Sequence, residues 1–231
     1  MSDNALHPPA SDFSGVSVSN TINTYRPSGN IRSKRIFDVL IASILLILTL
    51  PVFPLIAFVV LMDGWPVFHE HRRIGWRGRM FGCLKFRTMR ENADTILEAA
   101  LRQDPALRSE WDATRKLRND PRVTRVGRIL RKTSLDELPQ LLNVLKGDMS
   151  LVGPRPVMPD ELEKYYGPAG TSTYLSVRPG LTGLWQVSRR SDTNYRDRVV
   201  LDCAYVANMS LANDVGLLFR TVGCLIRLNG A

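Results

Sequence analysis

The sequence predicts a helix-rich α/β fold with a small β element, preceded by a re-entrant membrane helix and carrying amphipathic surface helices. Three observations predict this fold. An uncharged apolar run near the N-terminus is interrupted by prolines, later segments space their apolar residues with helical periodicity, and one short segment resembles a strand. A chain of 231 residues has room for one domain plus an anchor, but not for two full enzyme domains.

Residues 1–30 consist largely of Ser, Asn, Thr, Pro and Gly, with few large apolar side chains. Such a segment buries too little surface to offset the entropy of ordering, so we expect a flexible tail. Its first residues lack the basic and apolar regions of a signal peptide, which predicts that the domain is not exported. The three cysteines (Cys83, Cys203 and Cys224) are too widely spaced for a disulfide framework and indicate a reducing compartment.

Residues 31–64 form a basic flank followed by a candidate membrane helix. Residues 39–62 carry no charge and are numerous enough to cross a bilayer, but Pro51 and Pro54 disfavour a straight helix because proline lacks a backbone donor. Both sides of the run are basic, with Arg32, Lys34 and Arg35 before it and Arg72, Arg73, Arg77 and Arg79 after it. Since positive charge favours the cytoplasmic side, we expect a helix that enters one leaflet, bends at Pro51 and returns. A kinked helix that crosses the membrane is the alternative.

Residues 65–231 are expected to form one domain at the membrane surface. Within it, residues 80–90 resemble a short strand with a basic end. Residues 91–117 have the spacing of a surface helix that is interrupted at Asp104 and Pro105.

The second half of this domain predicts two further helices and two rigid turns. Residues 134–146 place four leucines on one helix face: Leu138, Leu141, Leu142 and Leu145. Prolines within residues 152–156 and 178–180 predict the turns. In the last helix, residues 211–228, Arg220 and Arg227 share a face and another side is apolar: Val215, Leu218, Val222 and Leu225. This amphipathic pattern predicts a helix that lies on a membrane or on the core.

The charge of the chain calls for an anionic partner. There are 31 Lys and Arg residues against 22 Asp and Glu, which gives a net charge of +9. Nucleic acid, anionic lipid and a phosphorylated substrate would each satisfy it. The basic run 115–132 has no interleaved aromatic residues and no nucleic-acid motif, so we expect no nucleic-acid binding. His69 and His71 lack a third ligand at useful spacing, which indicates a solvated pair rather than a metal site.

The densest chemical signal is the pair of adjacent carboxylates Asp136 and Glu137, which follows a strongly basic segment. One interpretation is purely structural. Ser134 and Glu137 match a capping box, or Asp136 is itself the N-cap and Pro139 occupies the third helical position. Local sequence alone leaves this register open and favours capping over catalysis.

The surroundings of the two acids favour phosphoryl chemistry. Such transfer needs a nucleophile in line, a cation at the developing charge and positioned Arg or Lys donors. A carboxylate can be that nucleophile, and a neighbouring carboxylate suits Mg²⁺. Lys85, Arg131 and Arg155 are the candidate phosphate-binding cations, and Arg155 is stiffened by a proline on either side.

Several blocks of the sequence carry a resemblance to a known family. They are KRIFD (34–38), the proline-broken apolar helix, KFRTM (85–89), RKTSLDELPQLLNVLKGDMSLVGPRP (131–156) and RPGLTGLWQVS (178–188). In this order they resemble the bacterial sugar transferases, the polyprenyl-phosphate hexose-1-phosphate transferases that start exopolysaccharide, O-antigen and capsule repeat units. The resemblance runs from about residue 32 to the C-terminus. The short length is similar to that of the exopolysaccharide-initiating members.

The resemblance implies transfer of hexose-1-phosphate from a UDP-hexose, galactose or glucose, to undecaprenyl phosphate, with release of UMP. It implies a monotopic protein at the cytoplasmic face of the bacterial inner membrane, in contact with anionic lipids. By this resemblance Asp136 is the nucleophile that carries the phosphosugar, and Glu137 is the ligand of Mg²⁺, for which Mn²⁺ could substitute. Lys85, Arg131 and Arg155 become active-site cations, and Pro51 breaks the membrane helix.

The chain departs from the family pattern at two positions. Leu50 stands where relatives often carry Ser before the proline, with Thr49 one residue earlier, and Arg189 stands where they commonly carry Gly. A non-catalytic scaffold that binds anionic lipids is the alternative function, but it would not need adjacent acids beside VGPRP. The sequence does not specify the hexose. It leaves the oligomeric state open, and a homodimer is compatible with it.

Overall fold

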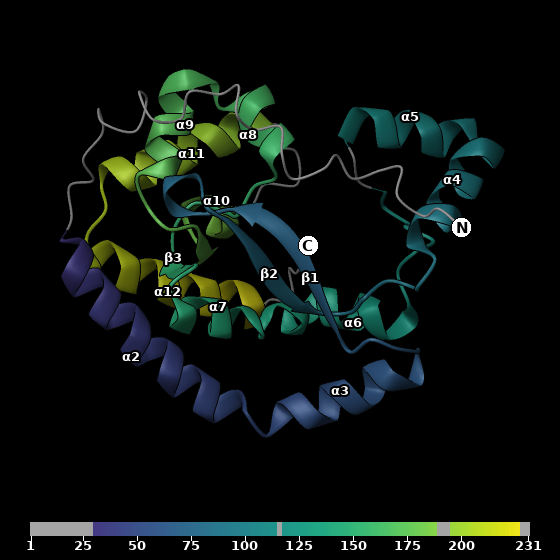
Figure 1. Cartoon of the computed structure of the whole chain (residues 1–231), viewed down its shortest axis with the longest axis horizontal. Helices are drawn as coiled ribbons and strands as arrows, with labels where there is room; N and C mark the ends of the chain where they lie inside the picture. Colours follow the sequence, from purple (N-terminus) through teal and green to yellow (C-terminus); the bar gives the residue numbers. More distant parts are fainter. Residues whose placement is uncertain (1–29, 115–116, 189–194, 227–231) are drawn as a thin grey trace.

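The computed structural model describes residues 30–114, 117–188 and 195–226. Residues 1–29 of the predicted tail, Arg115, Arg189 and Arg227 therefore lie outside the described residues, whereas Asn30 is described. A long bent arm of two helices runs along one side of the molecule, and the rest of the chain packs on its concave side (Figure 1).

The arm consists of α2 (Ile31–Thr49) and α3 (Val52–Met62), which are bent by 63° relative to each other. The bend follows from proline chemistry, because Pro51 is the N-cap of α3 and Pro54 lies in its first turn, where no intrahelical donor is required. The Thr49 hydroxyl donates to the Leu45 carbonyl oxygen at 2.7 Å, so it is used within α2. Within the described ranges no single helix is long and apolar enough to span a membrane, whereas the two helices of this bent pair together meet the requirement by length and composition only.

Two small sheets lie above the arm. The antiparallel hairpin β1 (Phe68–Ile74) and β2 (Met80–Phe86) confirms the predicted strand over its first seven residues and adds a partner strand. The turn between the strands contains a 3-10 helix, η2 (Trp76–Gly78). The second sheet pairs β3 (Ser150–Val152) in parallel with β4 (Gly180–Thr182), and each strand overlaps one residue of a predicted turn, 152–156 or 178–180. The sequence predicts no strand in either segment. Gly180 permits this pairing, since a Cβ there would overlap the backbone of Gly153.

The remaining helices surround these sheets. The predicted surface helix is interrupted as expected, into α4 (Ala93–Gln103) and α5 (Pro105–Thr114), and Asp104 accepts a 2.8 Å hydrogen bond from Ala106 N at the start of α5. Next come α6 (Arg125–Thr133), η3 (Leu135–Glu137) and α7 (Gln140–Lys146). The C-terminal helices are α8 (Pro159–Tyr165), α9 (Gly167–Leu175), α10 (Leu184–Val187), α11 (Tyr195–Ala207) and α12 (Leu211–Ile226).

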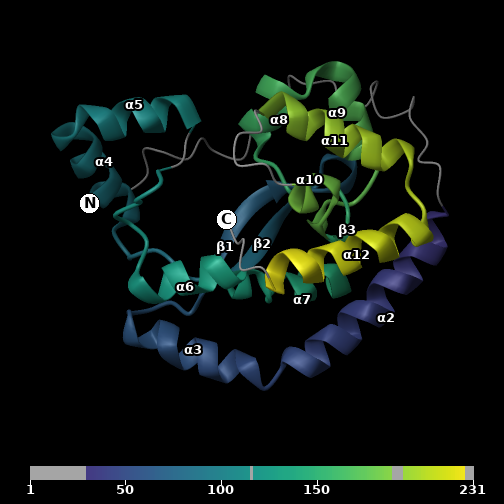
Figure 2. The same cartoon turned by 180° about the vertical axis from the view of Figure 1, so that it is seen from behind.

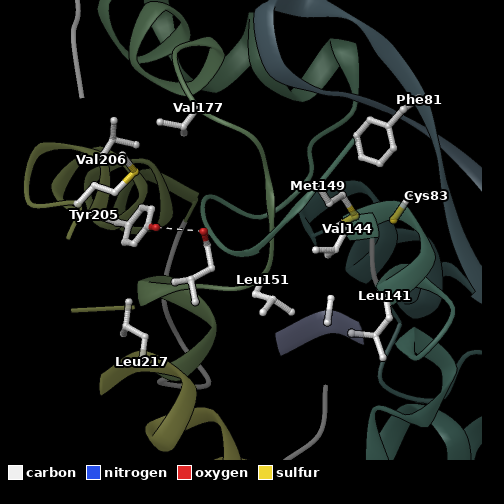
Figure 3. Packing of buried hydrophobic residues seen from close by; sticks show 13 residues of the cluster. Phe81, Cys83, Leu141, Val144, Met149, Leu151, Val177, Tyr205, Val206 and Leu217 are labelled. Atoms are coloured by element: carbon white, nitrogen blue, oxygen red, sulfur yellow. Dashed lines mark hydrogen bonds between the residues drawn. The ribbon is translucent and has the colours of Figure 1, made fainter. Parts of the chain in front are cut away.

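The main core lies between β2, α7, β3, α11 and α12 and closes against α2. Figure 3 shows side chains of these elements packed in one interior, with Val144 of α7 next to Met149 and near Cys83 of β2. A second cluster packs α3 against β2 and α6 through Ile56, Val60, Phe86 and Leu130. The arm is therefore held to the domain at both of its ends.

The start of α2 is docked by a buried polar network. Lys34 Nζ lies 2.7 Å from Asp214 Oδ2 of α12, and Asp38 accepts a 2.7 Å hydrogen bond from the Ser150 hydroxyl of β3. Arg35 donates to the Val144 and Leu145 carbonyl oxygens at the end of α7. In the sequence, Lys34 and Arg35 belong with Arg32 to the basic cluster that flanks the apolar run, whereas in the structure Lys34 and Arg35 bind groups inside the protein.

The apolar side of α12 that the sequence places on a membrane or on the core is largely exposed. Val215, Val222 and Leu225 are exposed, and Leu218 packs partly against the main core. The buried side of α12 is formed instead by Asp214 and Leu217. Figure 2 shows α6, α7 and α12 lying in one layer between the arm and the helices α8, α9 and α11.

Candidate active site

Asp136 and Glu137 lie in the short 3-10 turn η3, between α6 and α7. Pro139 accounts for this turn, because it cannot donate to the Leu135 carbonyl four residues earlier. The Leu138 N–H closes the turn instead, at 3.3 Å from that oxygen. The predicted continuous helix over residues 134–146 is therefore wrong in its first part.

Neither capping register forms as predicted, although Ser134 does stand at the N-cap position of η3. Ser134 adopts a left-handed conformation with φ of 58°, ends α6, and makes no capping hydrogen bond through its side chain. The residue at the N-cap of α7 is Pro139, not Asp136. The two carboxylates are therefore not explained as helix caps, which removes the structural interpretation that local sequence favours.

Lys85 reaches the two acids from β2. Its Nζ lies 2.7 Å from Glu137 Oε1 and 3.8 Å from Asp136 Oδ2. The Asp136 side chain is only 8% exposed. Burial raises the pKa of Asp136, while the Lys85 ammonium opposes the rise and the Glu137 carboxylate adds to it. The structure thus brings together a buried carboxylate of raised basicity, a second carboxylate and a cation.

Arg155 enters the site from the loop after β3. Its Nη2 lies 3.7 Å from Glu137 Oε1, and its guanidinium lies 5.9 Å from the centre of the Trp185 ring. The Arg155 carbonyl oxygen accepts a 3.2 Å hydrogen bond from Arg198 Nη2 of α11. With a proline on each side and its carbonyl held, the backbone of Arg155 presents the guanidinium at little ordering cost.

Arg131 approaches from the last turn of α6. Its Nε donates to the Thr88 hydroxyl at 2.9 Å. Burial lowers the pKa of Arg131, and the nearby Asp136 carboxylate opposes that shift. Gly127 lets α6 pack this closely, because a Cβ there would overlap the Thr88 carbonyl group. Arg131 therefore lies close enough to Asp136 for their charges to interact, although no ion pair between them within 4.0 Å is found in the part of the chain that the structure describes.

The donor set fits a magnesium ion that is completed by a substrate. In the described ranges, no group of three His, Cys, Asp or Glu residues could hold a metal ion by itself. Mg²⁺ commonly takes one or two protein carboxylates and fills its shell with phosphate oxygens and water, and Asp136 and Glu137 offer that set. His69 and His71 have rings 6.0 Å apart and belong to no such group. Burial lowers the pKa of both.

A buried polar cluster of Arg198, Asp202 and Tyr166 contacts the loop that carries Arg155 and was not predicted from the sequence. Arg198 Nε lies 3.8 Å from Asp202 Oδ2, and the Tyr166 hydroxyl donates to the same oxygen at 2.7 Å. Burial raises the pKa of Asp202 to about 6. The four-residue spacing of Arg198 and Asp202 on one helix is the signal that could have found this pair. Through the Arg198 contact, the cluster supports the loop that carries Arg155.

Sequence reasoning also missed Asn143, which is buried in α7 and bridges this helix to β2. On the continuous helix that the sequence predicts, it would lie near the face of Asp136, seven residues earlier. That spacing is the signal available in the sequence.

Comparison with known proteins adds independent findings. Residues 29–228 match the family model described as bacterial sugar transferase. The exopolysaccharide production protein ExoY of Rhizobium meliloti is 56% identical over 205 residues, which cover 87% of this chain and 89% of that protein. The undecaprenyl-phosphate galactose phosphotransferase of Salmonella typhimurium is 50% identical over 198 residues, covering 86% of this chain and 41% of that protein. The UDP-glucose:undecaprenyl-phosphate glucose-1-phosphate transferase of Caulobacter vibrioides is 39% identical over 225 residues, covering 90% and 77%.

Proposed function

The chain belongs to the bacterial sugar transferase family, and on that premise we propose that it transfers hexose-1-phosphate from a UDP-hexose to undecaprenyl phosphate. The product would be the lipid-linked sugar on which an exopolysaccharide repeat unit is built. The observation that carries the proposal is the convergence of Lys85 and Arg155 on the Asp136–Glu137 pair. Three cations around two carboxylates, with Arg131 as the third, leave an excess positive charge suited to a diphosphate.

In the first step the Asp136 carboxylate attacks the phosphorus atom that bears the sugar. A bond forms between the carboxylate oxygen and that phosphorus, and the bond to the bridging oxygen of the diphosphate breaks. UMP leaves with the electron pair of that bond, and the sugar phosphate stays on Asp136 as an acyl phosphate. Burial of Asp136 raises its basicity and so favours it as the attacking group.

In the second step the terminal oxygen of undecaprenyl phosphate attacks the same phosphorus atom. The Asp136 carboxylate departs with its electron pair and is regenerated. Lys85, Arg131 and Arg155 stabilise negative charge on the transferring group in both steps. Glu137, together with substrate phosphate oxygens, would hold Mg²⁺, for which Mn²⁺ could substitute. The metal would supply charge neutralisation on those oxygens.

The exposed apolar surface supports placement at a membrane. Large apolar side chains are exposed along the arm, on α6 and on α12, among them Ile47, Leu48, Phe58, Met62, Ile129, Phe219 and Ile226. Such a surface is unusual for a soluble monomer. We place α2 and α3 in one leaflet as a re-entrant pair, with α6 and α12 at the headgroups (Figure 2). The net charge of +9 favours anionic lipids and the cytoplasmic face of the inner membrane.

The decisive experiment measures UMP release from UDP-galactose and UDP-glucose in membrane fractions with Mg²⁺. Both sugars are used because similar relatives are named for each. We expect release that depends on added undecaprenyl phosphate and is lost in Asp136→Asn. A lipid-binding scaffold predicts no such release, and a folded Asp136→Asn protein with normal turnover would contradict the mechanism.

A further inference from the structure

Asn143 occupies the space where a third strand would pair with the β1–β2 hairpin. It lies in α7 and is only 1% exposed. Its side-chain Nδ2 donates to the Gly82 carbonyl oxygen at 2.8 Å, and its Oδ1 accepts from the Leu84 N–H at 3.0 Å. A carboxamide carries an acceptor oxygen beside an NH2 group with two donors, so its oxygen and one N–H satisfy this free strand edge as a backbone peptide would. Nδ2 also lies 3.4 Å from Asp148 Oδ2.

The two bonded groups belong to the strand that carries Lys85. Leu84 immediately precedes Lys85, so the hydrogen bond from the Leu84 N–H restrains the backbone from which the lysine side chain extends. The backbone of Asn143 is held as well, since its carbonyl oxygen accepts from Gly147 N at 3.1 Å and from Asp148 N at 3.0 Å. Asn143 therefore connects β2 to a helix that is closed at its C-terminal end.

At the other end of the same helix are the two acids. Glu137 is separated from α7 only by Leu138 and Pro139, and its Oε1 receives Lys85 Nζ at 2.7 Å. A displacement of β2 along α7 would change this distance and the 3.8 Å separation between Lys85 and Asp136 directly.

We propose that Asn143 is a positioning residue that sets the register of Lys85 against Glu137 and Asp136. The assignment rests on the proposed function for its catalytic consequence, but the positioning itself is a statement about geometry. Loss of the amide would leave the Gly82 carbonyl and the Leu84 N–H without their partner and free the strand to shift. An error of about 1 Å in an active site can cost roughly 100-fold in rate.

The test compares Asn143→Ala with Val144→Ala, its neighbour in the same helix. Val144 is fully buried and its side chain belongs to the main core, so its truncation controls for loss of core stability. Where Asn143→Ala does not fold, Asn143→Asp takes its place. That variant keeps the acceptor for Leu84 N–H, loses the donors to the Gly82 carbonyl oxygen and to Asp148 Oδ2, and places a second carboxylate beside Asp148.

Kinetics provides the first readout. We expect kcat for UMP release to fall roughly 10- to 100-fold in the Asn143 variant with little change in KM, and to stay near wild type in Val144→Ala. In a Lys85→Met background the same Asn143 substitution should cause little further loss, because the residue that it positions is gone. Equal kcat values for the Asn143 and Val144 variants at matched melting temperature would overturn the proposal.

Chemical labelling provides a second readout that does not depend on turnover. Acetic anhydride is applied to the folded protein, and acetylation of Lys85 is quantified by mass spectrometry. Release of Lys85 from Glu137 should raise its labelling rate in the Asn143 variant and not in Val144→Ala. An unchanged rate refutes the positioning role. A wild-type protein that releases no UMP refutes the proposed function instead, while the labelling result still decides the role of Asn143.

Discussion

Replacement of Arg155 by lysine separates positive charge from geometry in the proposed active site. Lysine keeps the charge but loses the planar pair of donors with which arginine binds a phosphate. The substitution should leave the fold intact, because the backbone carbonyl of Arg155, and not its side chain, receives the Arg198 hydrogen bond. Arg155→Lys therefore tests the guanidinium itself.

The expected magnitude follows from the position of the side chain. Loss of one positioned donor to developing charge costs about 2–4 kcal/mol of transition-state stabilisation. At about 1.4 kcal/mol per factor of ten, this is a decrease of roughly 30- to 900-fold. The Arg155 side chain is 30% exposed, so solvent screens part of the interaction. We therefore expect the lower part of the range, about 30- to 100-fold in kcat/KM.

The assay is the initial rate of UMP release over a range of UDP-hexose concentrations, at saturating undecaprenyl phosphate and Mg²⁺. Arg102→Lys is the matched control, because Arg102 is an exposed residue of α4 that pairs with Glu98 in the same helix. It should retain the wild-type rate. A folded Arg155→Lys protein with wild-type kcat/KM would remove the guanidinium from the reaction.

Three further predictions concern topology and stability. A cysteine introduced at position 33 should not be labelled when a membrane-impermeant reagent is applied to the periplasmic side of intact cells, and adding Pro51→Leu should make that cysteine accessible. Labelling of the cysteine without Pro51→Leu would reject the re-entrant arm. Burial raises the pKa of Asp136, so the folded protein binds the proton of this carboxyl group more tightly than the unfolded chain does. At pH values above the folded-state pKa, the ionised Asp136 carboxylate therefore lowers the free energy of unfolding. Asp136→Asn should therefore raise the melting temperature near pH 7, with a gain that disappears as the pH falls below the unfolded pKa; an equal gain at all pH values would contradict this. Lys34→Met should lower the free energy of unfolding by about 3–5 kcal/mol, because it leaves a buried carboxylate unpaired, whereas exposed Arg32→Met should have little effect in the same thermal melt.

Features set by covalent chemistry or by near neighbours could be predicted from the sequence. The bend of the arm follows from the missing donor of Pro51, and the break between α4 and α5 follows from Asp104 and Pro105. The adjacency of Asp136 and Glu137 needs no folding. In each case the residues that cause the feature lie within one helical turn of it, so the local sequence is enough to predict the feature.

Features that join distant segments were decided by packing. Lys85 and Glu137 are 52 residues apart, and Lys34 and Asp214 are 180 apart. The sequence marks Lys85 as a candidate cation and Lys34 as a flanking charge, but periodicity contains no signal for either pairing. The parallel pairing of β3 with β4 is also hidden, because each strand has only three residues and is stabilised by its neighbours.

The register of the turn that carries Asp136 and Glu137 shows both contributions in one segment. From sequence alone, Ser134, Glu137 and Pro139 fit two capping registers, and the structure adopts neither. Proline chemistry excludes a continuous helix, but the choice of a 3-10 turn depends on where β2 and α6 hold the segment. The sequence by itself determined which groups are available for the chemistry. The tertiary structure decided that they meet, because only packing brings the ammonium of β2 to the carboxylates that precede α7.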